Sequence, residues 1–255
     1  MKEYPRTKQL ILHIPHSSEN IPHTRGYVVN RAIIDEEILK LTDWHTDDLF
    51  SFEDSIDVKA NFSRVFCDTE RFSDDSQEVM AKFGMGVLYE KADDGSVIRK
   101  INQEVRDSIL NEYYWPHHEK LNKAVEKQLN AHGKALIIDC HSFPNIPFNR
   151  SLNTRMPRPD FNIGTDSFHT PNYLIELSKD FFTEKGYTIG IDWPYSGSIV
   201  PLKYYKQNKN VESIMLEVNR RLYLKEGTNE KSENYLPIKE VVSEYLEMIQ
   251  IAFNK

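Results

Sequence analysis

Two histidines of this chain each follow an apolar segment of strand character, at positions far apart in the sequence. His16 comes after residues 9–14 and Pro15, and His141 comes after residues 135–139. Ligands and catalytic groups gather at the strand ends of open α/β sheets. A mononuclear zinc hydrolase holds its ion with three protein ligands and leaves a fourth position for water. The histidine pair therefore predicts a metal-dependent hydrolase, with ring nitrogens within roughly 5 Å of each other because Zn–N bonds are about 2.1 Å long.

Two carboxylates compete to be the third metal ligand. Glu19 stands three residues after His16, a spacing at which a histidine and a carboxylate in one turn can face the same ion. Asp43 is the alternative, within the segment 42–47, which places carboxylates, a tryptophan and a histidine at the end of a predicted helix. Asp139 or a backbone carbonyl is expected to orient a ligating imidazole through its other ring nitrogen, which fixes the tautomer of the ring.

Glu217 is a carboxylate inside an apolar segment, between Leu216 and Val218. Burial raises the pKa of a carboxyl group and suits it to carry a proton from a metal-bound water to a leaving amine. Glu217 is therefore the predicted general acid/base. A buried ion pair with Arg220 or Arg221 is the alternative interpretation.

Arginines in or near apolar segments are candidates for binding a substrate carboxylate. A guanidinium can hold a carboxylate by two parallel hydrogen bonds. Arg64, which lies between Phe62 and Phe66, is predicted to do this or to stabilise an oxyanion, and a structural pair with Asp68 is the alternative. The full set of predicted substrate-binding arginines is Arg64, Arg71, Arg150 and Arg220.

Hydrophobic periodicity predicts that strands and helices alternate along the chain. Strands are expected at 9–14, 135–139 and 213–218, with one or two short strands within 58–67. Helices are expected at 33–41, 104–131 with a bend at Pro116, 173–185 and 238–253. Residues 73–100 are expected to form a loop or lid, and 145–166 a long functional loop or edge element. The alternation predicts a three-layer α/β/α fold with a mixed, mostly parallel central sheet, as one domain over 1–255.

The composition of the 255 residues fits a soluble enzyme. Hydrophobic content is 39%, and the net charge of -7 argues against nucleic acid or a polybasic membrane contact. No apolar run approaches the roughly 20 residues needed to cross a bilayer. The N-terminal residues 1–5 are polar and unlike a signal peptide, so a cytoplasmic location is expected. The two cysteines, Cys67 and Cys140, are too few for a disulfide framework.

The motifs together resemble those of the N-formylglutamate amidohydrolases, a family similar in fold to the zinc carboxypeptidases and the aspartoacylases. The resemblance is carried, in the family's order, by segments 10–22, 42–47, 64–71, 139–142, 162–165 and 217–223. It implies zinc ligation by His16 and His141, a substrate clamp from Arg64 and Arg71, and acid/base catalysis by Glu217. It also implies a place in histidine degradation.

The chain departs from the family's pattern at two points. The family commonly has a small or hydroxyl residue where Glu19 stands, whereas Asp43 matches its Thr-Asp-Trp segment. Glu19 instead matches the His-x-x-Glu of the carboxypeptidase relatives, so both carboxylates stay candidates. Thr69 and Glu70 precede Arg71 where the family usually has Leu-Asn, which predicts an altered substrate pocket.

The expected function is hydrolysis of a small N-acyl amino acid, N-formylglutamate first, by a zinc-dependent amidohydrolase. The expected partner is thus a small acidic molecule. A carboxypeptidase-like peptide hydrolase, which needs an open groove, is one alternative. A non-catalytic protein that binds an acidic metabolite is the other, although such a protein has no use for a water-activating ion.

Overall fold

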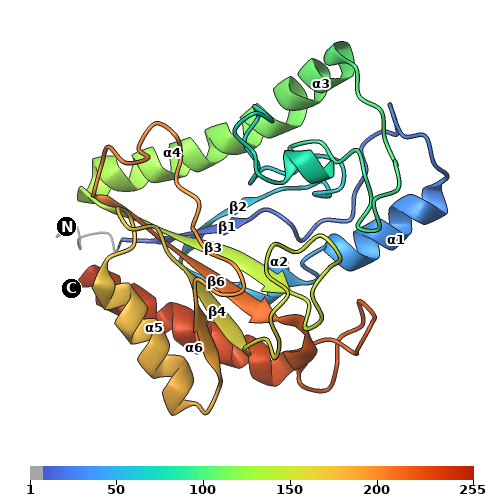
Figure 1. The fold of residues 1–255 in the computed structure, drawn as a ribbon. Coiled ribbons are helices and arrows are strands. Elements are labelled where there is room, and N and C mark those ends of the chain that lie inside the picture. The colour runs from blue at the N-terminus through green and yellow to red at the C-terminus, as the bar shows by residue number, and fades with distance from the viewer. Residues whose placement is uncertain (1–7) are drawn as a thin grey trace.

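The computed structural model describes residues 8–255, and in this range one six-stranded sheet organises the molecule (Figure 1). The strands are β1 (Leu10–Ile14), β2 (Ser55–Lys59), β3 (Ala135–Phe143), β4 (Phe161–Gly164), β5 (Ile189–Ile191) and β6 (Val211–Asn219). Their spatial order is β2-β1-β3-β6-β4-β5, and every neighbouring pair is parallel except β6 and β4. This is the mixed, mostly parallel sheet that the sequence predicts. The polar segment 1–5 lies outside the described residues.

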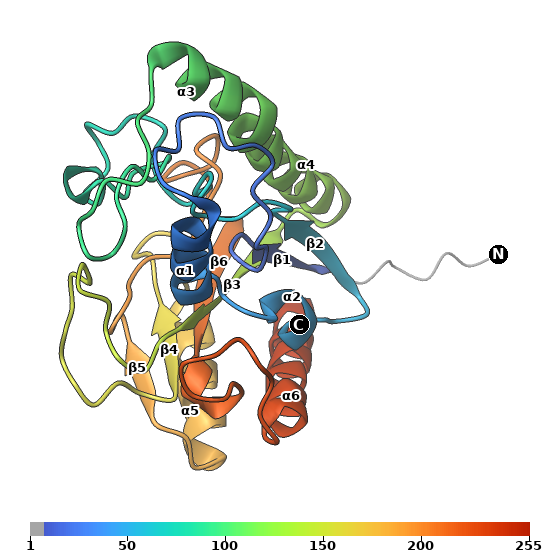
Figure 2. The same ribbon diagram turned by 90° about the vertical axis from the view of Figure 1, so that its right-hand side faces the viewer.

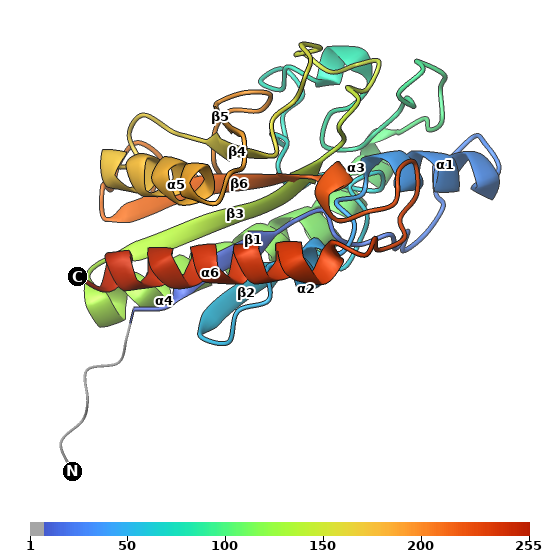
Figure 3. The same ribbon diagram turned by 90° about the horizontal axis from the view of Figure 1, so that it is seen from below.

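Helices cover both faces of the sheet, which gives the three predicted layers. Helices α3 (Gln103–Ile109) and α4 (Trp115–His132) lie on one face, and α5 (Asn172–Glu184) and α6 (Tyr235–Asn254) lie on the other (Figures 1 and 3). The short α1 (Arg31–Leu41) and α2 (Thr46–Leu49) lie at the carboxyl ends of the strands (Figure 2). The fold is α/β with three layers. No helix within residues 8–255 is long and apolar enough to span a bilayer.

Side-chain alternation along the strands decides which residues face which helices. Leu12, Ile138 and Leu216 belong to the core cluster that also holds the buried residues of α5 and α6. Ile11 and Ile137 belong to a second cluster with the buried residues of α4. Because successive strand residues point to opposite faces, His13 in β1 and Asp139 and His141 in β3 also point to the α4 side. The side chains on this face therefore become polar toward the carboxyl ends of these two strands.

Several predicted boundaries differ from the observed ones. The long helix predicted at 104–131 is two helices joined by a π-helical turn at Leu110–Tyr114, directly before the segment that contains Pro116. The strand predicted at 58–67 ends at Lys59, because the chain then turns, with Phe66 N bonded to Ser63 O. The predicted loop 145–166 includes β4, and β5 was not predicted.

Residues 73–100 are mostly irregular, with one 3₁₀ turn, η1 (Ala81–Phe83). Their apolar side chains nevertheless pack into the core, where Val87, Tyr89 and Ile98 are buried. The backbone of Val87 also accepts a hydrogen bond from Asp68 N over 2.8 Å. The segment thus forms a packed wall beside the carboxyl ends of the strands.

Candidate active site

The candidate site lies on the α4 side of the sheet, at the carboxyl ends of β1, β3 and β6. Strand register places His13 beside Asp139 and His141 beside Glu217 on neighbouring parallel strands. Paired positions point to the same face of a sheet, so these four side chains share one surface. All four are buried. The same period of two that builds the apolar core therefore also builds a polar cluster at its end.

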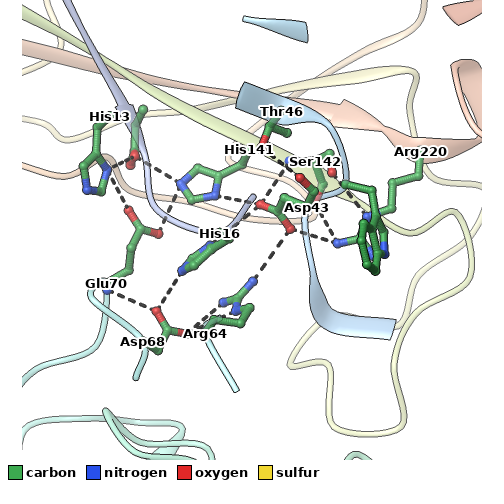
Figure 4. Close-up of polar contacts among 12 residues, drawn as sticks. His13, His16, Asp43, Thr46, Arg64, Asp68, Glu70, His141, Ser142 and Arg220 are labelled. Atoms are coloured by element: carbon green, nitrogen blue, oxygen red, sulfur yellow. Dashed lines mark hydrogen bonds and ion pairs between the residues drawn. The ribbon is translucent and has the colours of Figure 1, made fainter. Parts of the chain in front are cut away.

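His16, Asp43 and His141 come together from three distant segments (Figure 4). Asp43 Oδ2 lies 3.1 Å from His141 Nδ1 and 3.7 Å from His16 Nδ1, and the two imidazole centroids are 5.1 Å apart. Ligand atoms about 2.1 Å from a tetrahedral ion are roughly 3.4 Å apart, so the distances of Asp43 Oδ2 from the two rings suit a shared ion. The backbone holds the arrangement, because Asp43 N donates to His16 O over 3.0 Å. Asp43 thus reaches the space between the two histidines.

On each imidazole, a carboxylate holds Nε2, the ring nitrogen that points away from Asp43. Asp68 Oδ1 lies 2.8 Å from His16 Nε2, and Asp139 Oδ1 lies 3.1 Å from His141 Nε2. Nδ1 of each ring then points toward Asp43, and His16 Nδ1 is a buried atom without a hydrogen-bond partner among residues 8–255. Imidazoles that ligate a metal are held from behind in this way. The two nitrogens and one carboxylate oxygen are a donor set that suits zinc.

The electrostatic field of the cluster favours positive charge between the carboxylates. Burial and Arg64 lower the pKa of His16, but Asp68 and Asp43 outweigh them and raise it. Burial also lowers the pKa of His141, yet the carboxylates of Glu70, Asp139 and Asp43 raise it well above the usual value. Burial opposes ionisation of Asp43, but hydrogen bonds from the two histidines hold its pKa well below the usual range. A cation placed here meets a field that is already favourable.

Glu19 does not join this cluster, which corrects its expected role as a possible third ligand. Residues 17–20, all within the described part of the chain, form no helical turn after His16. The side chain of Glu19 is exposed, whereas His16 and Asp43 are buried. The spacing His-x-x-Glu aligns two ligands only where the chain turns back on itself. Here residues 17–20 have no helical or strand conformation, and Glu19 is exposed to solvent.

Glu70 is the carboxylate that the sequence did not assign to the site. Its ligand atoms lie within 4.8 Å of those of His16 and His141, and a second such set joins Glu70 to His13 and Asp139. Glu70 Oε2 lies 3.2 Å from His141 Nε2, the nitrogen that Asp139 already faces. Among residues 8–255, the groups of three side chains whose ligand atoms all lie within 4.8 Å of one another contain Glu70 and not Asp43. Asp43 lies on the Nδ1 side of both rings, with its Oδ2 3.1 Å from His141 Nδ1 and 3.7 Å from His16 Nδ1, so both carboxylates stay candidates for the third donor. The sequence feature that pointed to Glu70 was the departure from the family pattern at Thr69-Glu70.

Glu217 is buried beside the histidine cluster, by which we mean His16 and His141, and it forms no ion pair with the described residues 8–255. Its side chain is 7% exposed, and its Oε2 has no hydrogen-bond partner within the described residues. Burial and the nearby Asp43 raise the pKa of Glu217 to about 7, against the influence of His141 and Arg220. The alternative of an ion pair with Arg220 or Arg221 is not realised, because these arginines pair with Asp43 and Asp160.

Arg220 and Arg150 use most of their donors inside the protein. Arg220 Nη2 donates to Asp43 Oδ1 over 2.8 Å, and its Nη1 donates to Lys40 O over 2.6 Å. Arg150 Nε donates to the carbonyl oxygen of Asp93 over 3.1 Å, and its Nη1 donates to that of Phe83. Arg220 therefore orients a candidate ligand, and Arg150 ties the loop 145–166 to the segment 73–100.

Arg64 and Arg71 retain donors for a ligand. Arg64 donates through Nη2 to Asp68 Oδ2 over 2.9 Å, while its Nη1 is 3.9 Å from the nearer Asp43 oxygen. The predicted structural pair with Asp68 thus exists, and it leaves Nη1 toward the histidine cluster. Arg71 Nε is buried and lacks a hydrogen-bond partner in the range 8–255. Arg71 Nε lies 3.6 Å from Asp68 Oδ2, and Arg71 Nη1 lies 3.8 Å from Glu78 Oε1.

Two adjoining cavities open onto these residues. The catalytic cavity, of about 340 Å³, is lined by His16, Asp43, Glu70, His141 and Glu217 and by all four predicted arginines, Arg64, Arg71, Arg150 and Arg220. The side cavity, of about 610 Å³, is lined by residues 69–72 and 196–203 and by the first turns of α4. Glu70, Arg71, Ser196 and Met215 belong to both walls. The catalytic cavity is large enough for a small acidic molecule.

Comparison with known proteins points to one family. Residues 8–224 match the family model described as N-formylglutamate amidohydrolase. The N-formylglutamate deformylase of Pseudomonas putida is 25% identical over 230 residues, which cover 85% of this chain and 82% of that protein.

Two solved structures share the fold along nearly the whole chain. The crystal structure of N-formylglutamate amidohydrolase from Ralstonia eutropha JMP134 superposes with a TM-score of 0.83 at 24% identity, over 96% of this chain and 94% of that one. A gene product of Agrobacterium tumefaciens superposes with a TM-score of 0.65 at 15% identity, over 96% and 93%. The three-layer architecture is therefore common to all three.

Proposed function

Because the chain belongs to the N-formylglutamate amidohydrolase family, we propose that it hydrolyses N-formylglutamate to formate and glutamate with the help of a bound zinc ion. The observation that carries the proposal is the placement of Glu217. A buried carboxylate with an unpartnered oxygen and a pKa raised to about 7 lies in one cavity with two histidines and a carboxylate suited to a metal. Perturbed acids of this kind are characteristic of catalytic sites.

The donors for the ion are His16, Asp43 and His141. Asp68 and Asp139 hold the imidazoles from behind, and Arg220 holds the second oxygen of Asp43. When bound, a zinc ion would polarise the amide carbonyl and lower the pKa of a water molecule toward neutrality. Glu70 is the competing carboxylate at the other side of His141.

Glu217 moves the proton in the proposed reaction. Its ionised form accepts a proton from the attacking water, whose oxygen bonds to the formyl carbon. The same proton then passes to the amide nitrogen as the carbon–nitrogen bond breaks, so that formate and glutamate leave and the carboxylate is restored. A pKa near the working pH lets one group act as base and then as acid.

Arg64 and Arg71 are proposed to bind the substrate. Arg71 Nε has no partner within the described residues, and a buried donor of this kind is costly until a ligand satisfies it. Arg64 Nη1 points toward the histidine cluster, where it can stabilise the developing oxyanion or a carboxylate. Arg150 completes the wall of the catalytic cavity at its loop side.

The test is hydrolysis by purified protein, with glutamate and formate both quantified. We expect release of the two products in equal amounts, loss of activity after treatment with a chelator, and recovery with zinc. A carboxypeptidase-like enzyme would instead release C-terminal residues from peptides and leave N-formylglutamate intact. A binding protein would bind N-formylglutamate without releasing formate. Either result would contradict the proposal.

A further inference from the structure

The side cavity carries an apolar surface that cleavage of a formyl group does not require. Phe72, Trp115 and Leu202 line it and are 45%, 43% and 61% exposed. They come from three separate segments: the loop after Arg71, the start of α4 and the loop after β5. Large apolar side chains that gather at one cavity mark a binding site for an apolar group, whereas single ones need no explanation.

The side cavity adjoins the catalytic cavity, and the two share part of their walls. Glu70 and Arg71 belong to both walls, and Asp139, which fixes the imidazole of His141, lies in the wall of the side cavity. A molecule whose scissile amide lies at the histidine cluster therefore extends into one cavity on each side of that amide. One half of the substrate occupies the catalytic cavity and the other half the side cavity.

The charged side chains in the two cavity walls indicate which half of the substrate each cavity binds. The catalytic cavity has more cationic than acidic side chains, namely Arg64, Arg71, Arg150 and Arg220 against Asp43, Glu70 and Glu217. In the side cavity the acidic side chains are in excess, namely Glu70, Glu119 and Asp139 against Arg71 and Lys203. A dicarboxylate such as glutamate is favoured in the first cavity and disfavoured in the second. The acyl half of the substrate then faces the apolar surface of Phe72, Trp115 and Leu202.

We propose that the side cavity is an acyl subsite, and that the chain hydrolyses N-acylglutamates whose acyl group is a medium-length aliphatic chain or an aromatic ring. This inference rests on the proposed function and extends its substrate class. The bond cleaved is the same amide: water adds to the acyl carbon, the carbon–nitrogen bond breaks, and the glutamate nitrogen takes the proton that Glu217 carries. The products are a carboxylic acid and glutamate.

A substrate series tests the proposal with the zinc-loaded full chain. The kcat/KM is measured for the N-formyl, N-acetyl, N-butanoyl, N-hexanoyl and N-benzoyl derivatives of L-glutamate. We expect it to rise with chain length, by about fourfold for each methylene that becomes buried. If the formyl compound is hydrolysed but the kcat/KM for the hexanoyl and benzoyl compounds is at least tenfold lower, the acyl subsite is overturned and the proposed function stands. If none of the series is hydrolysed, the proposed function fails and the inference fails with it.

A matched pair of leucine variants tests the location of the subsite. Leu202→Ala removes apolar surface from the side cavity, and Leu236→Ala removes the same group from α6, where Leu236 is 72% exposed and lines neither cavity. The ratio of kcat/KM for the hexanoyl compound to that for the formyl compound should fall about threefold to tenfold in Leu202→Ala. The ratio should stay at the wild-type value in Leu236→Ala. Equal ratios in both variants overturn the assignment. Both leucine side chains are largely exposed, so both variants are expected to fold.

Discussion

Replacing Glu217 by glutamine tests whether this carboxylate is kept for catalysis at the expense of stability. Its pKa lies at about 7 in the folded protein, mainly through burial, against an ordinary value of 4.5. A carboxyl group whose pKa is raised by folding favours the folded state at low pH, and this contribution is lost as the pH rises through the folded-state pKa. At about pH 8 the ionised Glu217 therefore destabilises the metal-free protein, by about 3 kcal/mol for the change from 4.5 to about 7.

The Glu217→Gln variant should thus be more stable than the wild type at about pH 8. The amide must itself lose water, so we expect about half of that energy to be recovered, which corresponds to a rise in Tm of roughly 3–6 °C. At about pH 4 both carboxyl and amide are neutral, and the Tm values should agree. Turnover should fall by at least about 10²-fold. Calorimetry of the chelated proteins at both pH values and a formate assay of the zinc-loaded proteins measure these effects.

Glu212→Gln is the matched control on the same strand. Glu212 is equally buried, but its oxygens lie 3.0 Å from Lys134 Nζ and 2.7 Å from the Tyr173 hydroxyl. Removing a compensated charge breaks an ion pair, so this variant should lose stability at about pH 8. The reasoning is refuted if Glu217→Gln loses stability as Glu212→Gln does, or if its turnover stays at the wild-type level.

Three further predictions concern the substrate, the metal and pH. Arg71→Met should raise the KM for N-formylglutamate about 10–100-fold with a smaller change in kcat, and Arg155→Met, an exposed arginine outside both cavities, should change neither. Asp68→Asn should weaken zinc affinity about 10–100-fold in a competition titration, because it weakens the support of His16 Nε2; unchanged affinity would contradict that role. The kcat/KM should fall as the pH drops below the pKa of Glu217, which is about 7 in the metal-free protein. A bound cation favours the carboxylate and lowers this pKa. A flat profile of kcat/KM between about pH 5 and 8 would refute the assignment.

The layers of the fold could be predicted because each element has a period that its sequence displays. The apolar runs that became β1, β3 and β6 and the amphipathic segments that became α5 and α6 were placed within a few residues. The errors occur where local signals are weak. The strand β5 has three residues and depends on pairing with β4, and the segment 60–67 forms turns although it is rich in β-type residues.

The site could be predicted only in part, because a sequence shows the type of a residue but not which residues meet across strands. His16 and His141 were predicted from their positions after strands, and Asp43 was one of two candidate carboxylates. Glu70 could not be assigned, because its place depends on how the turn after β2 folds over β3. Glu19 was a candidate on spacing alone, and spacing is informative only when the conformation of the intervening residues is known.

The measurement that tests the central claim most directly is the zinc content of four purified proteins, by elemental analysis: the wild type, Asp43→Asn, Glu70→Gln and Glu19→Gln. If His16, Asp43 and His141 hold the ion, the wild type should bind about one zinc per chain, consistent with a mononuclear site. Glu70→Gln and Glu19→Gln should keep that content, and Asp43→Asn should lose it. A wild-type protein that binds no divalent metal, or zinc that is lost from Glu70→Gln and kept by Asp43→Asn, would contradict the account.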